Sequence, residues 1–197
     1  MGKTTSPLQL KFVTSAIDAH DLPFTRAEVA MVGRSNVGKS SLINALANHR
    51  QLAHVSTTPG RTQLLNLFEQ PDGPTVMDLP GYGYAKVPEK IRGSWQAMIE
   101  GYLLGRENLV TIFTLVDGEI GPTKLDVGLL EWVRHHELPI QIVATKLDKV
   151  KPSKLGVRKQ ELATGCGVDV ASVVWVSADK GTGIDELRAM IRRAGSR

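Results

Sequence analysis

One short segment constrains this chain more than any other, because it matches the pattern G-x-x-x-x-G-K-[ST]. An apolar run over residues 28–33 predicts a strand that leads into the segment, and a helical pattern over residues 39–48 follows it. In a loop of this kind, backbone N–H groups and the start of the helix face nucleotide phosphates. The sequence therefore predicts a phosphate site at nine consecutive residues: Gly33, Arg34, Ser35, Asn36, Val37, Gly38, Lys39, Ser40 and Ser41.

A magnesium site is predicted beside this loop. Ser40 offers a hydroxyl ligand, and Asp78 ends a predicted strand, from which its carboxylate binds Mg²⁺ through a water. Asp78 also opens a D-x-x-G sequence, whose Gly81 N–H is placed to reach the γ-phosphate of a nucleoside triphosphate. That sequence alone is weak evidence, because it usually marks only a turn. Its position downstream of a phosphate loop makes it a strong signal.

A polar loop over residues 56–61 lies between these two motifs and ends next to Thr62. In such loops a hydroxyl reaches Mg²⁺ only when the γ-phosphate is present, which is how the loop senses hydrolysis. We assign this role to Thr62, with Gly60 and Arg61 beside the nucleotide. Thr57 and Thr58 are rival choices, since a threonine in a loop is more often a plain turn residue.

Two further segments predict that the base is guanine. Asp148 follows a predicted strand in the sequence Thr145-Lys146-Leu147-Asp148, and its carboxylate can accept hydrogen bonds from N1–H and the 2-amino group of guanine. Adenine offers neither donor, so such a site rejects it. The stem of Lys146 is expected to lie along the base. After the last strand, the Ala178 N–H is placed to donate to guanine O6, within the short segment Val176, Ser177 and Ala178.

The order of predicted elements indicates the fold class. Strands are predicted over residues 28–33, 63–69, 75–78, 109–116, 140–145 and 170–176, and helices over 39–48, 89–103, 122–136, 153–163 and 185–193. Such alternation predicts an α/β domain of three layers, with a mostly parallel six-stranded sheet covered by helices on both faces. Ligands of these folds bind beyond the carboxyl ends of the strands, where every motif above is located. This is the architecture of a P-loop NTPase G domain.

The length of 197 residues fits one domain, which we place at residues 22–197 after an N-terminal extension of residues 1–21. The apolar fraction is 42%, and no apolar run approaches the roughly 20 residues of a membrane span. We expect a cytoplasmic protein without a signal peptide. The net charge of +4 fits an anionic partner without requiring one. Two interpretations stay open for Arg188, Arg192, Arg193 and Arg197: a solvated helix face or a surface that faces RNA.

Four segments closely resemble the EngB (YihA/YsxC) family of bacterial GTPases, which is related to Era. They are Gly-Arg-Ser-Asn-Val-Gly-Lys-Ser-Ser at 33–41, Thr-Pro-Gly-Arg-Thr-Gln at 58–63, Asp-Leu-Pro-Gly-Tyr-Gly-Tyr-Ala at 78–85 and Thr-Lys-Leu-Asp-Lys at 145–149. The resemblance covers about residues 22–193. It implies a single G domain that binds GTP, GDP and Mg²⁺, contacts the large ribosomal subunit during its assembly, and is linked to cell division and septation. We expect a monomer that does not bind membranes.

The chain departs from the family pattern after the strand that ends at Asp117, where Glu119 replaces the usual arginine. Tyr82 occupies the position at which many GTPases carry a glutamine that orients the attacking water. Intrinsic hydrolysis should therefore be slow, roughly 10⁻⁴ to 10⁻³ per second. In related GTPases an asparagine at the position of Asn36 resembles a potassium ligand, so K⁺ is a candidate activator. The residues with candidate catalytic roles are Asn36, Lys39, Thr62 and Gly81, and the candidate arginine fingers in cis are Arg34 and Arg61.

Two other functions are weighed against a ribosome-assembly switch. The first is a regulatory GTPase that binds a protein partner in cell division, using Tyr82, Tyr84 and Trp95 as an apolar surface. The second is an ATP-dependent enzyme, which Asp148 argues against because its carboxylate has no good use with adenine.

Overall fold

The computed structural model describes residues 5–53, 64–71, 73–83 and 89–195, and within these ranges the side chains of residues 89–92 and 94–96 are not described. Its strands form one sheet in the order β1-β3-β4-β2-β5-β6-β7. The strands are β1 (Lys11–Ala16), β2 (Glu28–Gly33), β3 (Leu65–Glu69), β4 (Thr75–Asp78), β5 (Leu109–Asp117), β6 (Ile140–Thr145) and β7 (Val174–Trp175). Pairing is parallel from β4 to β7, and antiparallel between β1 and β3 and between β3 and β4.

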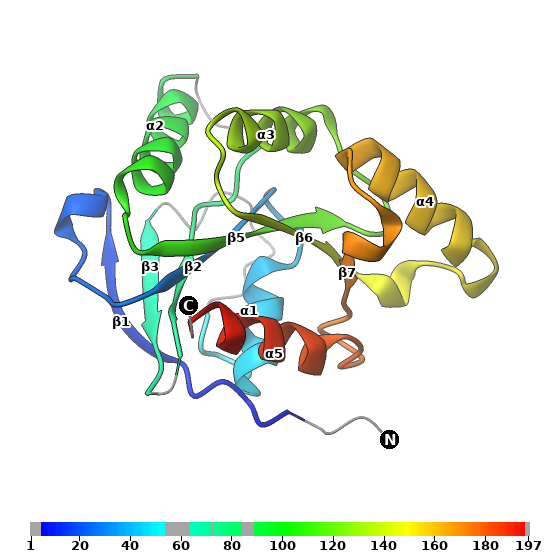
Figure 1. Cartoon of the computed structure of the whole chain (residues 1–197), viewed down its shortest axis with the longest axis horizontal. Helices are drawn as coiled ribbons and strands as arrows, with labels where there is room; N and C mark the ends of the chain where they lie inside the picture. Colours follow the sequence, from blue (N-terminus) through cyan, green and yellow to red (C-terminus); the bar gives the residue numbers. More distant parts are fainter. Residues whose placement is uncertain (1–4, 54–63, 72, 84–88, 196–197) are drawn as a thin grey trace.

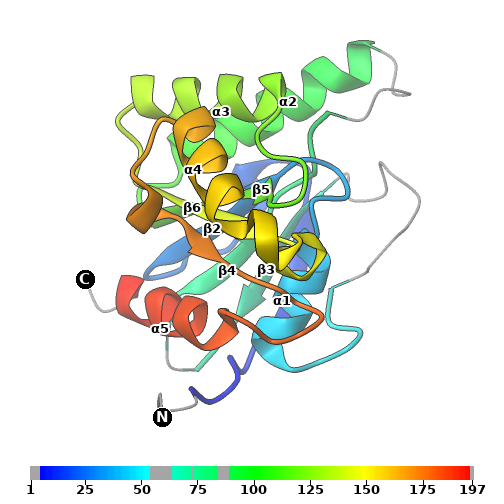
Figure 2. The same ribbon diagram turned by 90° about the vertical axis from the view of Figure 1, so that its right-hand side faces the viewer.

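Helices cover both faces of this sheet (Figures 1 and 2). The helices α2 (Glu89–Gly105), α3 (Lys124–His135) and α4 (Leu155–Cys166) lie on one side, and α1 (Lys39–Ala47) and α5 (Ile184–Ala194) lie on the other. The predicted α/β fold class, a three-layer G domain with a mostly parallel sheet, is therefore confirmed. Among the described residues, no helix combines the length and apolarity that crossing a membrane requires.

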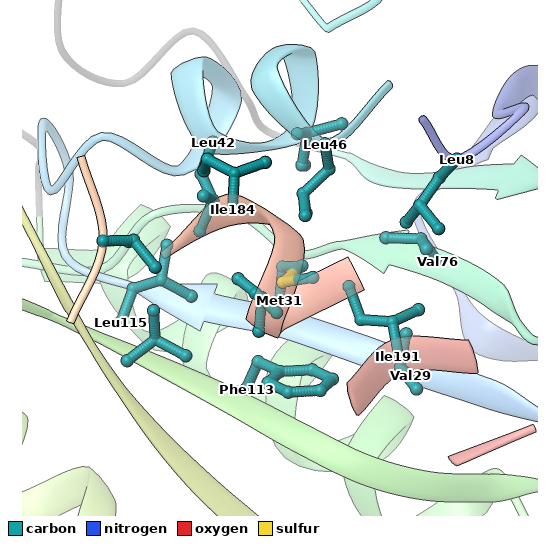
Figure 3. Packing of buried hydrophobic residues seen from close by; sticks show 14 of the residues in the cluster. Leu8, Val29, Met31, Leu42, Leu46, Val76, Phe113, Leu115, Ile184 and Ile191 are labelled. Atoms are coloured by element: carbon teal, nitrogen blue, oxygen red, sulfur yellow. The ribbon is translucent and has the colours of Figure 1, made fainter. Parts of the chain in front are cut away.

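The central strand β2 divides the core between the two faces because successive side chains of a strand point to opposite sides. Val29 and Met31 belong to a buried cluster with α1 and α5, whose side chains point toward one another in Figure 3. Ala30 and Val32 belong to a second cluster that includes side chains of α2 and α3. Burial on both faces explains why β2 is a continuous apolar run in the sequence.

Within the described ranges the sheet has seven strands, whereas the sequence predicts six. The additional strand β1 lies within residues 1–21, which are predicted to be an extension outside the domain. β1 lies at the edge of the sheet, and Ala16 is its single fully buried residue. An edge strand with so little burial carries no alternating apolar pattern, which is why the sequence does not predict it. At the opposite edge, β7 is only two residues long, because a 3-10 turn occupies Val170–Ser172.

Two of the arginines near the carboxyl end have structural partners. The guanidinium of Arg188 is buried and donates to the carbonyls of Leu46 at 2.9 Å and Ala45 at 2.8 Å, at the end of α1. Arg192 donates to the carbonyl of Ser6 at 2.6 Å. These contacts join α5 to α1 and to the N-terminal segment, so both side chains have a role within the fold. Arg193 is exposed, and Arg197 lies outside the described residues.

Candidate nucleotide-binding site

The predicted phosphate loop connects the end of β2 to the start of α1. Asn36 and Gly38 both have left-handed backbone conformations, with φ of 65° and 99°. Gly33 is closely surrounded, because a Cβ there would lie 2.9 Å from Val37 Cγ1 and 3.0 Å from the carbonyl oxygen of Leu115. Gly38 caps α1 without a side-chain acceptor, so the first N–H groups of the helix stay available to an anion. This backbone geometry fits a phosphate group.

Lys39 is the first residue of α1, directly after the phosphate loop, and Asp78 is the last residue of β4. β2 and β4 pair so that Met31 lies beside Asp78, which places the Asp78 carboxylate at the base of the phosphate loop. The Lys39 ammonium donates to Asp78 Oδ1, and both side chains are buried. Ser40, the next residue, is half-buried. A hydroxyl and a carboxylate are hard oxygen donors, so the predicted ligands Ser40 and Asp78 fit Mg²⁺ by their chemistry.

The D-x-x-G segment, together with the following residue Tyr82, lies directly against the phosphate loop. Ser35 N–H donates to the carbonyl of Tyr82 at 2.8 Å, and Tyr82 N–H donates to the carbonyl of Gly33 at 3.3 Å. A Cβ at Gly81 would lie 3.1 Å from the backbone nitrogen of Ser35, so a larger residue there would push the two segments apart. The backbone of Gly81, predicted to donate to the γ-phosphate, is therefore beside the loop that is predicted to bind phosphates.

The side chain of Tyr82 is turned toward α3. Its hydroxyl donates to Asp126 Oδ1 at 2.7 Å, and Arg34 Nε lies 3.4 Å from Asp126 Oδ2. Burial, followed by the charge and hydrogen bond of Asp126, raises the pKa of the Tyr82 phenol well above its ordinary value. The phenol therefore stays protonated and donates at neutral pH. Sequence reasoning did not single out Asp126, although the sequence Thr123-x-x-Asp126 before an apolar helix is a capping signal.

Thr145 links the predicted base site to the phosphate loop. Its buried hydroxyl donates to the carbonyl of Val37 at 2.6 Å. Lys146, which has a left-handed backbone, donates from its ammonium to Asp117 Oδ2 at 2.6 Å. Asp117 is a second carboxylate that sequence reasoning did not assign to the site. Its Oδ1 accepts the Glu119 N–H at 2.9 Å, and because this contact uses the backbone, the exposed acidic side chain of Glu119 leaves it unchanged.

Asp148 is positioned by the last loop. Ser177 Oγ donates to Asp148 Oδ1 at 2.6 Å and accepts the Lys180 N–H at 3.0 Å. The hydrogen bond from Ser177 is the main reason that the pKa of Asp148 lies below its ordinary value. Val176 joins the two loops, because its carbonyl accepts the Leu147 N–H at 3.0 Å. Ala178, predicted to donate to guanine O6, directly follows Ser177 and is half-buried.

The fold thus brings the phosphate loop, Asp78 to Tyr82, Thr145 to Asp148 and Val176 to Ala178 to the carboxyl ends of neighbouring strands. Other predicted site residues, which belong to the threonine loop, lie outside the described residues: Thr57, Thr58, Gly60, Arg61 and Thr62. The same holds for Tyr84 and for the side chain of Trp95.

Comparison with known proteins gives consistent results. The model of a family described as 50S ribosome-binding GTPase matches residues 28–146. A protein described as a probable GTP-binding protein EngB, from Tolumonas auensis, is 45% identical over 186 residues, which cover 93% of this chain and 88% of the relative.

Two solved structures extend the comparison. The crystal structure of a probable GTP-binding protein engB has a TM-score of 0.72 at 24% identity and covers 86% of this chain and 99% of its own. At that identity the likeness concerns the fold. The NFeoB structure from S. thermophilus, bound to GDP·AlF₄⁻ and K⁺, has a TM-score of 0.62 at 25% identity, covering 84% of this chain and 60% of its own.

Proposed function

Because this chain belongs to the EngB family of GTP-binding proteins and is a GTPase, we propose that it acts as a switch in assembly of the large ribosomal subunit. The single observation that carries this proposal is the match over residues 28–146 to a family described by its binding to the 50S ribosome. In this proposal the protein works as a cytoplasmic monomer, and its loss impairs cell division and septation as a consequence of failed subunit assembly.

The proposed switch depends on the contact between the D-x-x-G segment and the phosphate loop. Gly81 lies against Ser35, so a γ-phosphate held by the loop is within reach of the Gly81 N–H. Ser40 and Asp78 would hold Mg²⁺, and Thr62 would add a second contact through that ion. When bound, the metal ion supplies positive charge to the phosphate oxygens. Hydrolysis removes both contacts, and the two loops then release the ribosomal subunit.

Guanine selectivity is assigned to Asp148. Ser177 fixes one of its oxygens at 2.6 Å, which directs the carboxylate before a base binds. The ammonium of Lys146 is fixed by Asp117, so the aliphatic stem of the lysine is available to cover the base. An adenine base would offer this carboxylate no counterpart to the N1–H and 2-amino donors of guanine, at a cost of about 1–3 kcal/mol or more.

Potassium is proposed as an activator of the slow intrinsic hydrolysis. Asn36 is exposed within the phosphate loop, at a left-handed backbone position with a φ of 65°. A structural neighbour, NFeoB, has been solved with K⁺. In this proposal turnover is faster in KCl than in NaCl at matched ionic strength. Equal turnover in the two salts would remove the role of K⁺.

Co-sedimentation with purified large ribosomal subunits tests the main proposal. The protein should sediment with subunits in a non-hydrolysable GTP analogue and stay in the supernatant with GDP. Lys39→Ala, which weakens phosphate binding, should abolish the difference between the two nucleotides. Binding that is the same in both nucleotide states would contradict the switch, and absence of binding in both would favour the alternative in which the GTPase regulates a protein partner in cell division.

A further inference from the structure

Asp126 gathers side chains from both segments that meet at the phosphate site. It lies in the first turn of α3, and its side chain is only 1% exposed. Oδ1 accepts the Tyr82 hydroxyl at 2.7 Å, while Oδ2 accepts the backbone N–H and the hydroxyl of Thr123, both at 2.7 Å. Arg34 Nε approaches Oδ2 to 3.4 Å. The buried carboxylate is thus compensated by donors on both oxygens and by a cation.

Arg34 and Tyr82 are also the two residues that join the phosphate loop to the D-x-x-G segment. They form an isolated parallel bridge, in which Tyr82 exchanges backbone hydrogen bonds with Gly33 and Ser35. The same pair therefore meets twice, once through the backbone and once through side chains that converge on Asp126. Because Gly81 directly precedes Tyr82, a displacement of Tyr82 moves the N–H that is placed to contact the γ-phosphate.

We propose that Asp126 is a positioning residue for GTP hydrolysis, which holds Tyr82 and Arg34 from α3 and so keeps the Gly81 N–H against the phosphate loop. In this proposal Tyr82 has a positioning role, because its hydroxyl donates to Asp126 rather than to an attacking water. The inference rests on the GTPase activity alone and is independent of the ribosomal role.

Capping of α3 is the competing role for Asp126, and the geometry separates the two. The cap uses Oδ2 and Thr123, whereas the link to the D-x-x-G segment uses Oδ1 and the Tyr82 hydroxyl. Tyr82→Phe removes the link and leaves the cap intact. Asp126→Asn keeps the shape of the side chain but removes the charge that attracts both Tyr82 and Arg34.

The chain offers a matched control at the opposite end of the sheet. There the Tyr102 hydroxyl donates to Glu28 Oε2 at 2.7 Å, and Arg106 pairs with the same carboxylate. Tyr102, Glu28 and Arg106 thus repeat the combination of a tyrosine, a carboxylate and an arginine away from the phosphate loop. Tyr102→Phe removes the same kind of buried hydrogen bond there. It should lower the urea midpoint while leaving the rate of hydrolysis unchanged.

The test measures single-turnover GTP hydrolysis and GTP affinity for the purified protein without ribosomes. Asp126→Asn and Tyr82→Phe should each lower the rate about 20-fold, within the range expected for a hydrogen bond to a charged group, and leave affinity within about twofold. The double variant should be no slower than the slower single variant, because both changes break one link. A rate that is unchanged or raised in Tyr82→Phe, additive losses, or an equal loss in Tyr102→Phe would overturn the proposal.

Titration of the tyrosine rings, followed by NMR with ¹³C-labelled tyrosine, checks the link itself. Burial and the neighbouring carboxylates raise the pKa values of both Tyr82 and Tyr102 well above the ordinary value. Asp126→Asn should lower the pKa of Tyr82 and leave that of Tyr102 in place. A Tyr82 pKa that does not change in this variant would show that the two side chains are not linked, and would overturn the proposal.

Discussion

Replacing Ser177 with alanine should weaken guanine-nucleotide binding by releasing the Asp148 carboxylate that is assigned to the base. The Ser177 hydroxyl holds Asp148 Oδ1 at 2.6 Å, and the Asp148 side chain is 11% exposed. A hydrogen bond to a charged group contributes about 1.5–3 kcal/mol, and water can replace part of it at this exposure. We therefore expect a loss of about 1–2 kcal/mol in the binding free energy of GDP, which is roughly a 5- to 30-fold weaker affinity.

The pH dependence of this loss shows whether Ser177 acts by positioning the Asp148 carboxylate or by changing its ionisation. Without Ser177, the pKa of Asp148 should rise toward its ordinary value of 3.8, so the carboxylate is still ionised at neutral pH. Isothermal titration with GDP should therefore show the same loss at pH 6.5 and at pH 8. Ser172→Ala, the same substitution at an exposed residue before β7, is the control. GDP affinity within twofold of the wild-type value in Ser177→Ala would refute the reasoning.

Two further predictions concern stability. Glu28→Gln should lower the free energy of unfolding by about 3 kcal/mol at pH 7, because it leaves Arg106 without its buried partner. Burial raises the pKa of Glu28, but hydrogen bonds, led by that from Arg106, outweigh this effect and leave the pKa below 4.5. The wild-type protein should therefore lose stability, seen as a lower urea midpoint, as the pH is reduced below 4.5. The midpoint of the variant should change less. Arg188→Ala should cost about 2–4 kcal/mol, against less than 0.5 kcal/mol for exposed Arg193→Ala, measured by urea unfolding.

The sequence predicts much of the fold because its motifs fall where buried strands end. The predicted bounds of β2, β4 and β6 agree with the structure, since each contains a buried apolar run that ends at a glycine or polar residue, namely Gly33, Asp78 or Thr145. β1 could not be predicted in the same way. Its residues lie on the sheet edge with little burial, and its place depends on pairing with β3, which is distant in the sequence.

The side chains that complete the site were harder to predict than the motifs. Asp126 and Asp117 are single carboxylates whose partners, Tyr82 and Lys146, lie 44 and 29 positions away along the chain. No local pattern connects such residues before the strands are placed side by side. The terminal arginines illustrate the same limit, because the sequence leaves open whether Arg188 faces solvent or RNA, and the carbonyls it binds belong to α1.

Displacement of a prebound fluorescent GDP analogue by competing nucleotides tests most directly the claim that these loops form a guanine-nucleotide site. The account predicts that excess GTP or GDP displaces the analogue, that excess ATP or ADP does not, and that Asp148→Ala abolishes the preference for guanine. Displacement by ATP as effective as that by GTP, or an unchanged preference in Asp148→Ala, would contradict it.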